Sequence, residues 1–213
     1  MKKYKSYLFL LLSIATLISS CKEEEKPEFD RKAMLTNMAS AVIIPAYQTL
    51  NASLAVFNTK ALDFIANPTS TTLNELRSQY IITNKNYQRC AMYSFGPALD
   101  YGIKGAFNTF PSDSAKIEAN ITAGTYTLGS VANTTAIGFP AIDYLLYFGS
   151  DSEILAKFTT DPEAANRKIY LTDLIFKMKT EFQPVLDQWN GSYQSTFIAA
   201  DGNDVASSCS FLL

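Results

Sequence analysis

A single apolar stripe between Pro162 and Trp189 constrains the fold of this chain more than any other feature of its sequence. Apolar side chains recur there at steps of three and four residues over seven turns: Leu171, Leu174, Ile175, Met178, Phe182, Val185, Leu186 and Trp189. Asp161 and Pro162 suit the start of a helix, and Asn190-Gly191 suits its end. The stripe predicts a long amphipathic helix with one buried face, kinked near its end by Pro184.

Two further stretches have the same period. The residues from about Thr71 to Tyr93 predict a second helix, and those from about Asp30 to Ala66 an earlier one, in which Pro45 should bend or break the chain. With about 190 residues after the leader, the chain can bury a substantial core. We therefore expect an all-α fold, a helical bundle.

The stretch between Gly96 and Gly138 has a weaker pattern. Five Gly and Pro residues lie between Gly96 and Pro111, which predicts a long irregular connection, followed by a short helix near Ser112 to Asn120. The Thr-rich segment after it could hold one or two short strands, but its alternation is poor, so a loop is favoured.

The N-terminus predicts export and a lipid anchor. Residues 1–20 carry three Lys and then an apolar run too short to span a bilayer, as in a signal peptide. Ile18-Ser19-Ser20-Cys21 is similar to a bacterial lipobox, which would acylate Cys21. The charged residues 21–30 then predict an acidic tether. Their Lys-Glu-Glu-Glu run resembles the export signal of bacterial surface lipoproteins, which implies a surface-exposed position on the outer membrane. An unmodified secreted protein is the alternative.

Composition removes several classes of function. The chain has no histidine, which excludes Ser-His-Asp triads, Cys-His dyads and His-ligated zinc within it. It has 20 acidic against 18 basic residues, three of the latter in the leader, so nothing indicates a nucleic-acid partner. Beyond Cys21, Cys90 and Cys209 could form a disulfide, although a buried free thiol at Cys90 is favoured.

Two segments resemble the imelysin-like family of bacterial envelope proteins. One is the helix that ends in Tyr87-Gln88 with its Phe95-Gly96-Pro97-Ala98 corner, and the other is GFPAIDYLLYFG, which begins at Gly138. The second matches the family's Gly-x-His-x-x-Glu signature at Gly138, Pro140 and Asp143. The resemblance covers about residues 35 to 200 and implies an all-helical fold of two bundle-like halves, with a role as a peptidase or in iron acquisition.

The match fails where a zinc peptidase would need it. Pro140 stands at the histidine position and has no side-chain donor atom, and Asp143 replaces glutamate. Asp143 could still bind an oxygen-coordinated ion such as iron or calcium, with partners sought among Asp100, Tyr101, Asp113 and Tyr144. A purely structural interpretation is that Pro140 preorganises a first helical turn and Asp143 favours the helix dipole.

From the sequence we predict a non-catalytic envelope lipoprotein that binds iron or a small ligand. The alternatives are an imelysin-type metallopeptidase and an inactive fragment. Because the chain ends on apolar residues with no helix stop, residues 31–213 are predicted to hold an N-terminal half and an incomplete second half.

Overall fold

The computed structural model describes residues 29–212, and these contain helices and loops but no strand. Residues Arg31–Leu213 form one compact unit. The predicted signal peptide, the lipidation of Cys21 and nearly all of the predicted tether lie outside the described residues. The prediction of an all-α fold is confirmed, and the Thr-rich segment is a loop with one 3-10 turn, as favoured.

The first long helix is continuous through Pro45, although its hydrogen-bonding register changes there. It comprises α2 (Arg31–Asn37), a π-helical segment (Met38–Ile43) and α3 (Ile44–Ala66). The Ile44 N–H donates to the carbonyl of Ala39, five residues back. A wider turn before a proline leaves room for its ring and tolerates the missing N–H. The helix is therefore not broken at Pro45.

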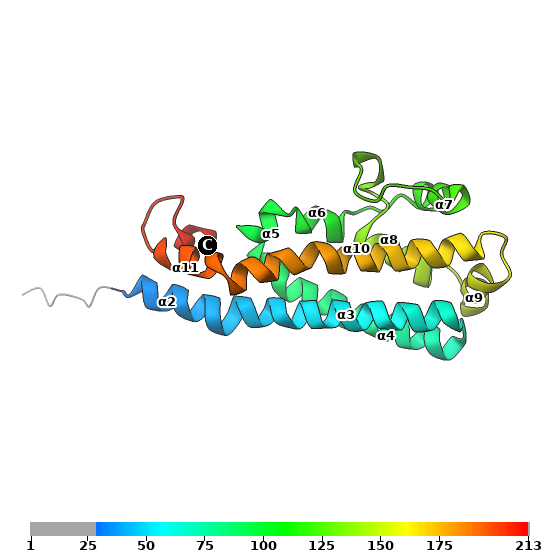
Figure 1. Cartoon of the computed structure of the whole chain (residues 1–213), viewed down its shortest axis with the longest axis horizontal. Coiled ribbons are helices and arrows are strands. Elements are labelled where there is room, and N and C mark those ends of the chain that lie inside the picture. Colours follow the sequence, from blue (N-terminus) through cyan, green and yellow to red (C-terminus); the bar gives the residue numbers. More distant parts are fainter. Residues whose placement is uncertain (1–28, 213) are drawn as a thin grey trace, which may run out of the picture. The chain divides into compact units, whose positions relative to one another are not determined.

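Two more long helices pack beside α3. The helix α4 (Ser70–Cys90) starts at a capping box formed by Thr69 and Thr72, and α10 (Ala164–Asn190) returns along α3. Figure 1 shows the three running side by side. The α10 helix begins after the predicted position, because the Asp161 carboxylate accepts from the Glu163 N–H in a turn before it.

The stretch from Gly96 to Gly138 is more regular than predicted. It holds α5 (Pro97–Asp100), α6 (Ile103–Asn108), α7 (Ser114–Ala123) and a 3-10 turn (Val131–Asn133). Gly96 and Gly102 have positive φ and flank the helices, and Pro97 occupies a first turn, where its missing N–H does no harm. The breakers thus separate short helices.

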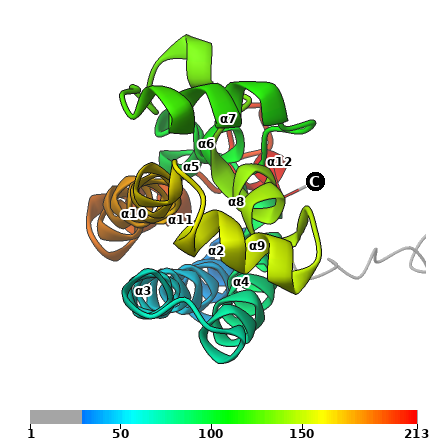
Figure 2. The same cartoon turned by 90° about the vertical axis from the view of Figure 1, so that its right-hand side faces the viewer.

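A central helix, α8 (Gly138–Tyr147), joins these layers. It contacts α4, α6, α7 and α10, and Figure 2 shows it between the α3–α4 pair and the layer of α5, α6 and α7. The helix α9 (Asp151–Thr159) follows it, and α11 (Ser192–Ala199) and α12 (Ser208–Phe211) complete the chain.

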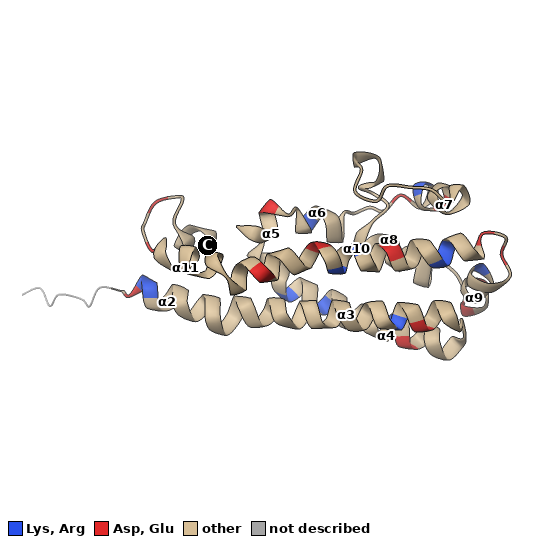
Figure 3. Cartoon of the chain, viewed as in Figure 1, with Lys and Arg blue, Asp and Glu red and all other residues tan. Residues whose placement is uncertain are grey.

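Among the described residues, the helix Arg31–Ala66 is the one long and apolar enough to cross a membrane by length and composition. Figure 3 shows how few charges α3 carries. Its fully buried Leu50, Leu54 and Phe57 belong to the same hydrophobic core as side chains of α4 and α10. A core helix accounts for this composition.

The structure has both described cysteines as free thiols. Cys90 is buried, which raises the pKa of its thiol to about 12. A buried thiol with a raised pKa is unreactive. Cys90 is therefore a buried free thiol, as the sequence analysis favoured, and forms no disulfide with Cys209.

Candidate functional site

The segment from Gly138 to Asp143 forms the first turns of α8, and Gly138 sets where that helix starts. Gly138 has φ +73° and lies against the C-terminal end of α6. A Cβ atom there would lie 2.4 Å from the carbonyl oxygen of Phe107 and 2.8 Å from that of Ala106. Both atoms belong to the backbone and cannot move aside cheaply. This position therefore requires glycine for its conformation and for the close approach of two helices.

Phe139 anchors the same turn in the core. Its side chain is 1% exposed, and its ring packs against those of Tyr80, Tyr87 and Phe107 at centroid distances of 5.8, 5.5 and 6.1 Å. Tyr80 and Tyr87 come from α4 and Phe107 from α6. Three aromatic rings from two helices, α4 and α6, therefore fix the start of α8.

The opposite side of α8 lines an open groove of about 300 Å³, which we call the signature groove. It is lined by Ser112, Ser114, Pro140, Asp143, Tyr144, Tyr147 and Phe148. The predicted residues Pro140 and Asp143 thus lie one turn apart on the same wall, while Gly138 lies behind it in the core. A volume of this size is at the lower end of small-molecule sites.

Asp143 is exposed, yet its charge acts on two tyrosines. Burial raises the pKa of Tyr80 far above its ordinary value, and the nearby Asp143 carboxylate adds to that rise. Burial also raises the pKa of Tyr147, again with a contribution from Asp143. Tyr80 and Tyr147 pack together at 5.7 Å. Asp143 therefore faces both the solvent and the edge of the aromatic core.

One of the four companions predicted for Asp143, Tyr144, lines the signature groove. The Tyr101 hydroxyl accepts a hydrogen bond from Gln188 at 3.3 Å, and Asp113 caps α7 by accepting from the Lys116 N–H at 2.9 Å. Asp100 lies on α5, and its charge contributes to the raised pKa of Tyr193. The last three are not among the lining residues.

The Tyr144 hydroxyl bonds to an ion pair between the half-buried Glu118 and the buried Arg167. It donates to Glu118 Oε1 at 2.9 Å, and the two terminal nitrogens of Arg167 donate to the Glu118 oxygens at 2.9 and 2.8 Å. Arg167 is 4% exposed, and its hydrogen bonds lower the pKa of Glu118. Burial and the bond to Glu118 raise the pKa of Tyr144 to about 12. Tyr144 is therefore a neutral donor held toward Glu118 and not a tyrosinate ligand beside Asp143.

The donor set of the signature groove does not complete the coordination of a bare metal ion. No group of three or more His, Cys, Asp or Glu side chains with the geometry to hold a metal occurs within residues 29–212. Asp143 is the single carboxylate lining the groove, beside the hydroxyls of two serines and two tyrosines. Hard ions such as calcium take six to eight oxygen ligands. A metal here would need to bring most of its own ligands.

The sequence did not predict two serines that line the groove, or Arg77, which bonds to the C-terminal end of α8. Ser112 reaches the groove from the connection before α7, and Ser114 from the first residue of that helix. Arg77 of α4 donates twice to the carbonyl of Leu146, at 2.9 and 2.7 Å, and pairs with Asp151 at 2.7 Å. These residues are distant in the chain, so the helical period of α8 carried no signal for them.

Comparison with known proteins gives one family match and several relatives. The family described as imelysin (peptidase M75) matches residues 43–210. An iron-regulated protein A from Synechococcus elongatus is 24% identical over an alignment of 204 residues, which covers 91% of this chain and 51% of that protein. The chain therefore spans about half the length of this curated relative.

Two solved structures share the fold. A candidate iron-regulated protein A precursor from Parabacteroides distasonis superposes with a TM-score of 0.71 at 18% identity, covering 87% of this chain and 55% of that one. An imelysin-like protein from Psychrobacter arcticum gives a TM-score of 0.51 at 20% identity, covering 85% of this chain and 59% of that one. Both likenesses concern the fold alone.

Proposed function

Since this chain belongs to the imelysin family, whose match covers residues 43–210, we propose that it is a non-catalytic envelope lipoprotein that binds a ligand in the signature groove. The observation that carries the proposal is that the signature groove has room for a ligand but lacks the histidine of the family signature. Pro140 stands where the family signature has histidine, and no other residue of the chain could supply an imidazole. Nitrogen-ligated zinc and a histidine base are then both absent from the chemistry of the groove.

We propose that the ligand is iron held in a small chelate. The iron relation comes from the names of the relatives in Synechococcus and Parabacteroides. A chelate fits this groove better than a bare ion, because Asp143 can add one oxygen to a ferric ion whose other ligands come with it. The exposed rings of Tyr147 and Phe148 would pack against the organic part of the chelate.

The lipid anchor at Cys21 and an outer-membrane location belong to the same proposal. They depend on the lipobox-like Ile18 to Cys21 run and the acidic stretch after it. Expression in a bacterial host with an alkyne-tagged fatty acid should label the wild-type chain and leave Cys21→Ser unlabelled. Equal labelling of both would contradict the anchor.

Isothermal titration of residues 22–213 with ferric citrate tests the binding. This form retains every residue of the described core. We expect saturable heat with ferric citrate and none with citrate alone, and a roughly tenfold weaker affinity for Asp143→Asn, which is about 1.4 kcal/mol. Asp63→Asn, which alters an exposed carboxylate outside the groove, is the matched control and should bind as the wild type does. No saturable heat, or equal losses in both variants, would contradict the proposal.

Incubation with unfolded casein tests the absence of catalysis. The purified chain should leave the substrate intact with or without added zinc. Cleavage that a chelator stops and that Asp143→Asn abolishes would restore the metallopeptidase alternative.

A further inference from the structure

A second groove lies between α10 and the loop that follows α7. We call it the Tyr126 groove; its volume is about 380 Å³, and it is lined by Tyr126, Leu128, Asp173, Phe176, Lys177, Thr180 and Glu181. The five α10 residues recur at steps of three, one, three and one, which places them on one face of the helix. None of the seven lines the signature groove.

The loop side of the groove is held in place by a buried polar network. Asn120 donates to Asn133 at 2.8 Å and to the Tyr170 hydroxyl at 3.2 Å, and Tyr170 donates to the carbonyl of Ala136 at 2.7 Å. The Tyr126 ring packs edge-on against Tyr170 at 4.8 Å. The wall is therefore preformed, which lowers the ordering cost of binding.

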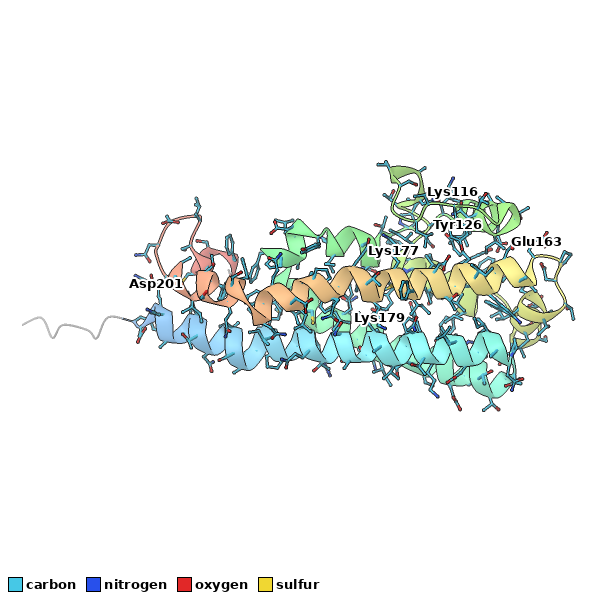
Figure 4. The ribbon with its side chains drawn as sticks, in the orientation of Figure 1. Lys116, Tyr126, Glu163, Lys177, Lys179 and Asp201 are labelled. Atoms are coloured by element: carbon cyan, nitrogen blue, oxygen red, sulfur yellow. The ribbon has the colours of Figure 1, made fainter. Side chains whose placement is uncertain are left out.

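The polar side chains of the groove are positioned but incompletely used. The Tyr126 hydroxyl donates to Asp173 Oδ2 at 2.8 Å, and Lys177 pairs with Glu181 through Oε1. The other carboxylate oxygen of Glu181 is covered and receives no hydrogen bond. A covered acceptor without a donor destabilises the folded chain, so a ligand that donates a hydrogen bond to Glu181 would be favoured in this groove. Figure 4 shows Tyr126 and Lys177 on the loop and helix sides of this region.

Phe176 adds an apolar surface beside these groups. Its side chain is 54% exposed, whereas Leu174, Ile175 and Met178 on the same stretch of α10 are buried. A large ring left in solvent next to carboxylates, an ammonium group and a tyrosine is not explained by core packing. It offers a face for an apolar surface of a ligand.

From these contacts we infer that the Tyr126 groove binds a neutral sugar. One face of a pyranose ring presents C–H groups that would pack on Phe176, and its hydroxyls would donate to Asp173 and Glu181 and accept from Lys177. A cationic ligand would compete with Lys177 for the carboxylates, and an anionic one would be repelled by them. A purely apolar ligand would leave the three charged groups without solvent.

Saturation-transfer NMR on residues 22–213 tests this inference. The probes are the methyl glycosides of glucose, galactose and mannose, and N-acetylglucosamine, each at up to about 10 mM, which detects dissociation constants in the millimolar range. We expect saturable binding of at least one of them and a loss of about tenfold or more in affinity for Phe176→Ala. Glu181→Gln, which keeps the shape of the side chain and removes its charge, should weaken the binding of the same sugar.

Ile169→Ala is the matched control for Phe176→Ala. Ile169 lies on the same helix, is also 54% exposed and does not line the groove, so its removal should leave sugar binding unchanged. Saturable binding by none of the four sugars would overturn the inference, and so would equal losses in the two variants. Ferric citrate titrations of Phe176→Ala should match the wild type, which separates this test from that of the signature groove.

Discussion

The two sides of α8 differ in what they require of their residues. On the core side, a Cβ atom added to Gly138 would lie 2.4 Å from a backbone oxygen, so only glycine fits there. Phe139 packs into an aromatic cluster on the same side. On the groove side, Pro140 and Asp143 face solvent in a hollow with room for a ligand. The signature therefore combines residues that hold the helix with residues that the fold does not need. A change of histidine to proline on the open side could be accepted without loss of stability.

The structural interpretation of Asp143 is weakened by the same comparison. Because α8 begins at Gly138, Asp143 is its sixth residue, and the first turn holds no acidic side chain. The dipole of a helix acts mainly within its first and last turns. Pro140, in contrast, is in the first turn, where a helix accommodates a proline without loss of a hydrogen bond.

The largest effect should come from Gly138→Ala. The new Cβ would overlap the backbone of Phe107, and positive φ adds about 1–2 kcal/mol of strain for an L-residue. We expect a loss of at least about 5 kcal/mol in the free energy of unfolding, which is in the exceptional range for one substitution. Chemical denaturation followed by circular dichroism measures it. Gly105→Ala, where a Cβ would meet nothing within 4 Å, is the control.

A smaller but still large loss should follow from Phe139→Ala. Removing a fully buried ring leaves a cavity among Tyr80, Tyr87 and Phe107, and such changes cost about 3–5 kcal/mol. Phe148→Ala, on the groove side at the C-terminal end of the same helix and 68% exposed, should cost less than about 0.5 kcal/mol. Equal losses in urea denaturation would remove the distinction between the two sides of α8.

The sequence predicted the long helices well because one buried stripe on each fixes the period. It was less accurate where tertiary contacts decide. Gly96 and Gly102 suggested irregular backbone, but they serve as the boundaries of α5 and α6. Gly138, Pro140 and Asp143 were located by motif, whereas Arg77 and Ser112 reach α8 from distant parts of the chain. The Tyr126 groove had one signal, Phe176 on the polar side of an amphipathic helix, but its other wall is a loop.

Arg77→Lys tests the hydrogen bonds that hold the C-terminal end of α8 in place. The guanidinium bonds the Leu146 carbonyl twice and Asp151 once, and a single ammonium cannot reproduce that fork. We expect a loss of about 1–3 kcal/mol in thermal or urea denaturation, as for hydrogen bonds to a charged group. Arg89→Lys should cost less, because the Arg89 guanidinium donates to Asn86 within the same helix. A similar cost at both positions would show that the Arg77 hydrogen bonds to Leu146 and Asp151 do not stabilise the C-terminal end of α8.

Acid should weaken the attachment of Tyr144 through Glu118. The pKa of Glu118 is lowered in the folded chain by its bonds to Arg167, so its contribution is present above its unfolded pKa of about 4.3 and is lost as pH falls through the lower folded value. The stability difference between wild type and Glu118→Gln should therefore be constant near neutral pH and shrink below about pH 4. Denaturation midpoints across that range measure it. A difference that does not change with pH would contradict the ion-pair account.

The smallest effect should come from Asp143→Asn, and it bears most directly on function. The substitution keeps the shape of an exposed side chain beyond the first turn of α8, so we expect a change within about 0.5 kcal/mol in the free energy of unfolding. Urea denaturation with an unchanged slope measures it, on the same protein used for ferric citrate titration. A loss above about 1 kcal/mol would assign Asp143 a structural role, because only a side chain needed for folding costs that much. Unchanged stability with weakened binding would instead set Asp143 apart from Gly138 and Phe139, as a residue that serves the ligand alone.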